Sequence, residues 1–146
     1  MRSTEIREVI FARGHENILA THETTLEITK KPNLSKKGNC VIAVSADKAL
    51  NDLSLKFKDN LRREDSKVTI LIEAGQIAET VNASGDPSLI LTHPSDLVVR
   101  KSSYICNRTL AVKADQASCD LSRILVEKLR NPKQRVKITL TLGLAE

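Results

Sequence analysis

The sequence has few aromatic residues, an odd number of cysteines and no long apolar run. Tryptophan is absent, and Phe11, Phe57 and Tyr104 are the only aromatic side chains among 146 residues. The core must therefore be aliphatic, and few rings are available for stacking on nucleic-acid bases. No apolar run approaches the roughly 20 residues of a membrane-spanning helix, so we expect no membrane partner. Met1–Glu8 is charged and no apolar stretch follows it, which predicts no signal peptide and a cytoplasmic location.

Known chemical motifs are also missing. The cysteines Cys40, Cys106 and Cys119 form no CxxC pair, which indicates free thiols and predicts no metal site. There is no Walker loop, GxGxxG, GxSxG or HExxH motif. We therefore predict no cofactor, and the sequence leaves open whether the protein is an enzyme. The oligomeric state is open as well.

What is present is typical of one ordinary globular domain over residues 1–146. The hydrophobic fraction is 40% and the charged fraction 28%, which argues against a disordered chain. Lys and Arg total 23 against 18 Asp and Glu, so the net charge is +5. A positive charge of this size permits a polyanionic partner such as nucleic acid, without demonstrating one.

The chain contains an internal repeat. Ile42–Gly75 aligns without a gap on Leu110–Gly143, and Ile6–Lys30 aligns on Ile77–Lys101. Of the 59 aligned positions 21 are identical, where average composition would give roughly 4. The offsets are 68 and 71 residues, because one loop of the first copy is longer. We therefore expect two copies related by a pseudo-two-fold axis.

Each copy, residues 5–75 and residues 76–143, is predicted to be four short strands, a helix and a final strand. Period-2 alternation indicates the first and last strands, and apolar spacing of three and four residues indicates the helix. The predicted elements of the first copy are strands Glu5–Ala12, Ile18–Thr21, Thr24–Lys30, Cys40–Ser45 and Lys67–Ala74, with a helix over Ala46–Leu61 before the last strand. Those of the second copy include strands Leu89–Thr92, Asp96–Lys101, Thr109–Lys113 and Gln134–Leu142, with a helix over Ala114–Leu129.

The expected architecture is α+β but mainly β, with two helices and a core that both copies share. A half of about 70 residues buries little by itself, so we expect the halves to close as one β-sandwich or barrel. Asp47 and Asp115 are predicted to cap the two helices, and Asp52 and Asp120 are predicted to be structural acceptors.

These residues resemble an archaeal family of uncharacterised proteins, a domain of unknown function numbered 371. The matching stretches are Val9–Lys30, Val44–Leu53, Leu91–Ser102 and Arg108–Leu121. The resemblance extends over nearly the whole chain and implies a mainly-β, jelly-roll-like or sandwich domain. It implies no activity, cofactor or catalytic residue.

Paired polar residues are the candidates for a catalytic or metal-binding role. A pseudo-two-fold axis can bring equivalent side chains together, and imidazoles beside carboxylates bind transition metals. The candidates are Glu8, His15, Glu16, His22, Glu79 and His93. The alternative is structural: the histidines hold turns, and Glu8 and Glu79 lie at a strand rim or form salt bridges. Inward glutamates without such partners would have a raised pKa.

Basic residues support a different hypothesis, a non-enzymatic domain that binds nucleic acid or another phosphorylated partner. The candidate contacts are Lys30, Lys31, Lys36, Lys37, Arg62, Arg63, Lys133, Arg135 and Lys137. The alternative for these residues is a solvated surface. We favour the binding domain over a small-molecule enzyme or metal protein that uses the paired His and Glu residues.

Overall fold

The computed structural model describes residues 5–143, which form two four-stranded sheets and two short helices. The long sheet has the order β1-β8-β4-β5 and is antiparallel throughout. Its strands are β1 (Glu5–Arg13), β8 (Arg135–Gly143), β4 (Lys67–Ala74) and β5 (Ile77–Ser84). The short sheet has the order β3-β2-β6-β7. Its strands are β3 (Val41–Ala43), β2 (Thr25–Thr29), β6 (Asp96–Arg100) and β7 (Thr109–Ala111).

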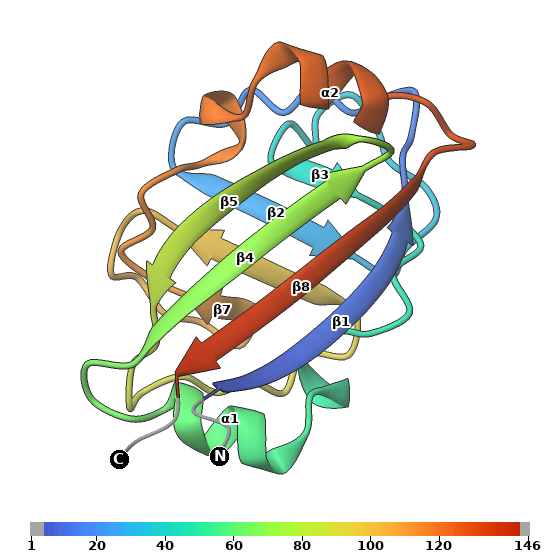
Figure 1. The fold of residues 1–146 in the computed structure, drawn as a ribbon. Helices are drawn as coiled ribbons and strands as arrows, with labels where there is room; N and C mark the ends of the chain where they lie inside the picture. The colour runs from blue at the N-terminus through green and yellow to red at the C-terminus, as the bar shows by residue number, and fades with distance from the viewer. Residues whose placement is uncertain (1–4, 144–146) are drawn as a thin grey trace.

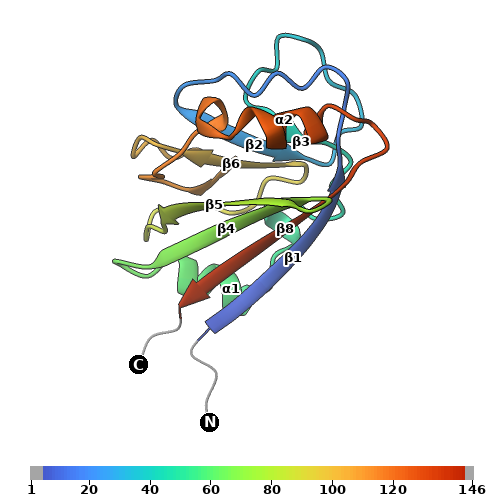
Figure 2. The same cartoon turned by 45° about the horizontal axis from the view of Figure 1, so that its top comes forward.

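The two sheets are stacked as layers, and the helices lie at opposite ends of the stack. Figure 1 shows the long sheet in front with the strands of the short sheet crossing behind it, and Figure 2 shows both layers closer to edge-on. Helix α1 (Leu55–Leu61) lies at one end and α2 (Arg123–Leu129) at the other. The mainly-β fold with two sheets and two helices is therefore confirmed.

The core between the sheets is aliphatic, as the composition predicts. Alternate residues of β8 and β4 point inward, and the inward side chains of β8 are fully buried. These are Val136, Ile138, Leu140 and Leu142. Phe57 of α1 is a fully buried ring that joins this core. The other set of alternate residues faces outward, and this alternation defines the outer face of the long sheet.

The expected closed barrel is wrong for residues 5–143. The long sheet ends at β1 and β5, and the short sheet ends at β3 and β7. Single β-bridges link the two layers at two corners, between Arg13 and Val44 and between Ser84 and Val112. Each bridge joins only one residue pair, so neither sheet continues into the other.

Two predicted strands are absent, because their apolar residues belong to core-packed loops. Residues 18–21 and 89–92 are irregular, although Ile18, Leu89 and Leu91 are buried in the core. Ala20 has φ 50° and Leu91 has φ 58°. This left-handed conformation is incompatible with a continuing strand.

The predicted helices are each broken into two pieces. In the first half a 3-10 turn, η1 (Leu50–Asp52), precedes α1, and in the second half η2 (Ser118–Asp120) precedes α2. Ser54 and Ser122 cap the two α-helices, because their hydroxyls accept from the Phe57 and Leu125 N–H groups at 3.1 and 3.2 Å. The apolar spacing fitted a single helix since the residues of both pieces face the core.

The prediction that Asp47 and Asp115 cap helices is also wrong. The Asp47 carboxylate accepts from the Phe11 N–H at 3.0 Å, and the Asp47 N–H donates to the Phe11 carbonyl at 2.9 Å. Asp115 holds Asn82 in the same way, with both distances 2.9 Å. Each aspartate therefore clamps the free edge of a long-sheet strand, β1 or β5, and satisfies main-chain groups that the sheet leaves open.

Candidate functional site

The structure does not bring His22 and His93 together. The two residues precede β2 and β6, which are antiparallel and pair Thr25 with Arg100, so the histidines lie at opposite ends of this strand pair. The His22 Nδ1 accepts from the Thr25 N–H at 3.1 Å. The His93 Nδ1 accepts from the Asp96 N–H at 2.9 Å. Each ring therefore holds the turn that starts its strand, and a ligand role for either stays a prediction.

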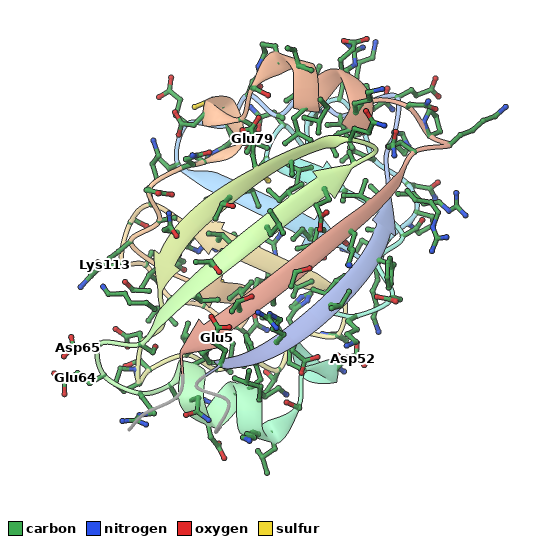
Figure 3. All side chains as sticks on the ribbon, in the orientation of Figure 1. Glu5, Asp52, Glu64, Asp65, Glu79 and Lys113 are labelled. Atoms are coloured by element: carbon green, nitrogen blue, oxygen red, sulfur yellow. The ribbon has the colours of Figure 1, made fainter. Side chains whose placement is uncertain are left out.

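Glu8 and Glu79 are also far apart, on the two edge strands β1 and β5. Glu8 is 8% exposed and accepts from the Ser54 N–H at 2.7 Å and from Lys48 Nζ at 2.9 Å. Burial raises the Glu8 pKa, but these two partners outweigh burial and the pKa falls below its usual value. Glu79 accepts from the Ser122 N–H at 3.0 Å, near the start of α2 (Figure 3). Both carboxylates thus attach a helix start to a sheet edge.

His15 and Glu16 lie in the loop after β1, beside the end of α2. The His15 N–H donates to the Leu129 carbonyl at 2.9 Å, and its Nδ1 accepts from the Asn17 N–H at 3.0 Å. Glu16 lines a shallow surface depression together with Arg130. This loop is therefore attached to the end of α2, and its catalytic role stays a prediction.

The predicted basic residues lie in three separate segments of the chain. Lys30 pairs with Asp52 at 2.6 Å. Lys31, Lys36 and Lys37 follow in the connection between β2 and β3. Arg62 and Arg63 follow α1, and Lys133, Arg135 and Lys137 lie where α2 turns into β8. The Arg62 side chain donates to the Leu89 and Ile90 carbonyls at 2.8 and 2.7 Å, so this arginine is committed to the fold.

The outer face of the long sheet is open and carries cations on β1 and β8. No helix covers this face in Figure 1. Arg13 and Arg135 are register partners across the ladder, and Phe11 is the partner of Lys137. The Arg135 guanidinium lies 5.5 Å from the centre of the Phe11 ring, which is 42% exposed. We call the outward residues of these two strands the β1–β8 surface; its charged members are Arg7, Arg13, Arg135, Lys137 and Glu5.

The other half of the same face has almost no net charge. Outward residues of β4 include Lys67 and Glu73, and those of β5 are Ala78, Thr80, Asn82 and Ser84. The repeat alignment matches Arg13 with Ser84, Phe11 with Asn82 and Lys137 with Thr69. Positive charge therefore concentrates on β1 and β8.

Sequence reasoning missed a buried ionic cluster on the outer side of the short sheet. Arg108 donates to Glu27 of β2 at 2.5 Å and to Asp96 of β6 at 2.9 Å. Glu27 and Asp96 are 7% and 3% exposed, and Thr29 Oγ1 also donates to Asp96 at 2.7 Å. We call Glu27, Asp96 and Arg108 the ionic triad. The available signal was an acidic residue next to aliphatic residues in each of two short strands, TLEIT and DLVVR.

The pKa values of the two carboxyl groups of the triad are shifted in opposite directions. Burial raises the Glu27 pKa above its usual value, although Arg108 opposes the shift. Burial also acts on Asp96, but the Thr29 hydroxyl and Arg108 outweigh it, so the Asp96 pKa is lowered. Cys40 Sγ contacts Glu27 at 3.6 Å, and burial together with this carboxylate raises the pKa of the thiol to about 11. The triad thus ties the connection between β6 and β7 to the centre of the short sheet.

Two further features bear on function. Within residues 5–143, no group of three or more His, Cys, Asp or Glu side chains is placed to hold a metal ion. No helix in the same range is long and apolar enough to cross a membrane.

Fold and site together define a mainly-β protein with two open sheets, and the outer face of the long sheet carries Arg13, Arg135 and Lys137. Residues 10–143 match the family described as "Domain of unknown function (DUF371)", and the chain belongs to this family. The chain is similar to "Uncharacterized protein MJ0206" of Methanocaldococcus jannaschii, with 44% identity over 128 residues that cover 88% of this chain and 94% of that protein. The resemblance found in the sequence to an uncharacterised archaeal family is confirmed, and the family has no assigned activity.

Proposed function

We propose that the protein is a non-enzymatic nucleic-acid-binding domain and that the β1–β8 surface is its binding site. The observation that carries the proposal is the placement of Arg13 directly opposite Arg135 on an open sheet face. Like charges at register positions destabilise a sheet. A phosphate between the two guanidinium groups would replace this repulsion with two charge-assisted contacts.

The charge pattern around this pair supports the same ligand. Lys137 follows Arg135 on the outer face of β8, and Lys133 precedes it in the turn. At the matched turn of the other half, Asp65 stands at the position equivalent to Lys133, and Figure 3 shows Glu64 and Asp65 at the opposite corner of the long sheet. A polyanion would therefore be attracted to one end of the face. The cytoplasmic location predicted from the sequence is compatible with such a ligand.

We also infer that residues 1–146 are a single domain that arose by internal duplication. Its two repeats, residues 5–75 and 76–143, would be related by a pseudo-two-fold axis. In support, the repeat alignment makes β1 to β4 equivalent to β5 to β8, in that order. Exchanging each strand for its equivalent reverses the strand order of each sheet and leaves the neighbours unchanged, as a two-fold axis requires. The contacts of Asp47 with Phe11 recur between Asp115 and Asn82. Both sheets contain strands of both repeats, so the core is shared. A folded monomeric fragment of residues 5–75, detected by circular dichroism, would contradict this inference.

The test of function is a fluorescence-anisotropy titration of a labelled oligonucleotide at about 50 and 200 mM salt. With four phosphate contacts on single-stranded nucleic acid, affinity should fall roughly 50-fold over this range. The double variant Arg13→Ser/Lys137→Thr installs the residues found at the matched positions of the other half. It should bind more weakly and show about half the salt dependence, because two contacts are lost.

The matched control is Lys36→Ser/Lys37→Thr, which removes the same charge from the exposed β2–β3 connection. This control should bind like the wild type. Absence of binding at low salt would contradict the proposed function. Equal weakening by both double variants would show that net charge, and not the β1–β8 surface, determines binding.

A further inference from the structure

An exposed aromatic ring lies among the cations of the β1–β8 surface. Phe11 is 42% exposed in a chain with only two phenylalanines. Its ring contacts the Arg135 guanidinium, and its register partner is Lys137. The other half of the protein has Asn82 at the matched position. The fold therefore accepts a polar side chain at the equivalent position of the other edge strand. Folding alone does not require an aromatic side chain at residue 11.

The main chain of Phe11 is fixed on both sides. Its outward N–H and carbonyl are held by Asp47 at 3.0 and 2.9 Å, and residue 11 also lies opposite Lys137 in the β1–β8 ladder. A ring on a rigid strand loses little conformational entropy when a ligand stacks on it. Phe11 is thus a preorganised stacking platform on a basic surface.

We propose that the ligand of this surface is single-stranded nucleic acid, with one base stacked on Phe11 and neighbouring phosphates bound by Arg13, Arg135 and Lys137. This inference rests on the proposed function. Bases in a duplex are stacked on one another and present only their edges, whereas a single strand exposes base faces to aromatic side chains. Arg13 lies two residues from Phe11 on the same face of β1, roughly 7 Å along the strand. One nucleotide can therefore contact both side chains.

The experiment compares three polyanions at low salt, with the polyphosphate matched to the single strand in phosphate number and the duplex carrying twice as many phosphates. They are a single-stranded oligonucleotide of about ten residues, the blunt duplex of the same sequence, and inorganic polyphosphate as a competitor without bases. The single strand should bind about tenfold more tightly than the other two. Phe11→Leu retains an apolar side chain but removes the aromatic face. It should weaken single-strand binding about tenfold while leaving polyphosphate binding and the salt dependence unchanged.

The chain offers a closely matched control in Tyr104. This ring is 62% exposed and lies 5.0 Å below the Arg100 guanidinium, in the connection between β6 and β7. Tyr104→Leu therefore removes an equivalent arginine–aromatic pair elsewhere on the molecule, and single-strand affinity should not change. Phe11→Leu and Tyr104→Leu should both have the unfolding midpoint temperature of the wild type. A loss of binding in a variant with that midpoint does not come from unfolding.

The outcomes separate the two proposals. If none of the three polyanions binds, the proposed function fails. If duplex and polyphosphate bind as tightly as the single strand and Phe11→Leu changes nothing, the proposed function stands and the single-strand inference is overturned. Concentration-dependent dimerisation that Phe11→Leu abolishes in analytical ultracentrifugation would also overturn it, because the face would then bind a second copy of the chain.

Discussion

Replacing Arg108 with methionine should destabilise the protein strongly at neutral pH. Arg108 bridges Glu27 and Asp96, whose side chains are 10% and 4% exposed, while its own side chain is 39% exposed. Methionine fills a similar space but supplies no charge and no donor. Both carboxylates would then remain buried in the folded state with much of their compensation removed.

The expected loss is about 3 kcal/mol of unfolding free energy at pH 7. Removing one member of a buried ion pair costs about 3–5 kcal/mol, and we take the lower end because solvent screens the half-exposed guanidinium. In addition, Asp96 keeps the Thr29 hydroxyl as a donor. For a domain of this length the loss corresponds to a decrease of about 10 °C in the unfolding midpoint.

The same substitution should change the pH dependence of stability. Burial already raises the Glu27 pKa, and loss of the opposing guanidinium raises it further above the unfolded value of about 4. Groups with a raised pKa stabilise the folded state at low pH and lose this contribution as pH rises through the folded pKa. The difference in unfolding free energy between the variant and the wild type should therefore become smaller as pH falls from 7 to 4.

Urea denaturation at several pH values measures both effects. Arg100→Met is the matched control, because Arg100 lies on the same sheet but donates to the Thr109 hydroxyl and the Cys106 sulfur, which are not carboxylates. It should give a smaller loss with little pH dependence over this range. Glu27→Gln in the Arg108→Met background should restore part of the stability. A loss below about 1 kcal/mol, or a gap that is constant with pH, would refute the reasoning.

Two further predictions follow from shifted pKa values. The lowered Glu8 pKa means that its contacts with Ser54 and Lys48 stabilise the fold above about pH 4 and are lost as pH falls. Glu8→Gln should therefore cost about 2 kcal/mol at pH 7 and little near pH 3, measured by urea denaturation; equal stability at pH 7 would contradict this. Burial raises the Cys40 pKa to about 11, whereas main-chain and arginine donors outweigh burial at Cys106 and lower its pKa. Cys106 should consequently be alkylated faster than Cys40 at pH 8, as measured by peptide mass spectrometry, and the reverse order would show that access dominates.

Local patterns were sufficient to predict the long strands but not the segments between them. The alternation in Gln134–Leu142 correctly predicted a strand, and β8 (Arg135–Gly143) occupies almost the same residues. Apolar spacing over Ala46–Leu61 was ambiguous, because a chain that turns at Ser54 can still bury the same side chains. Periodicity reports which residues face the core, and it does not report whether the main chain between them is helical.

The candidate sites show a second limit of sequence reasoning. Arg108 and Glu27 are 81 positions apart, so no local pattern could pair them. The histidines gave the opposite difficulty: they recur in the repeat and carry reactive rings, yet each ring nitrogen accepts from the main chain of an adjacent turn. The strand order decides which side chains meet, and it depends on long-range pairing that the sequence alone left open.

Differences between the two repeats locate function better than the features they share. The clamp by Asp47 on β1 and the clamp by Asp115 on β5 have the same geometry, so the needs of the fold account for both. Those needs do not account for the side chains that the clamps position, Phe11 in one repeat and Asn82 in the other. If the repeats began as one sequence, as proposed, the ring and the surrounding cations represent a change on one half of a shared scaffold. The ligand proposed for the β1–β8 surface would account for a change confined to one half, whereas the clamp on each edge strand has the same geometry in both halves.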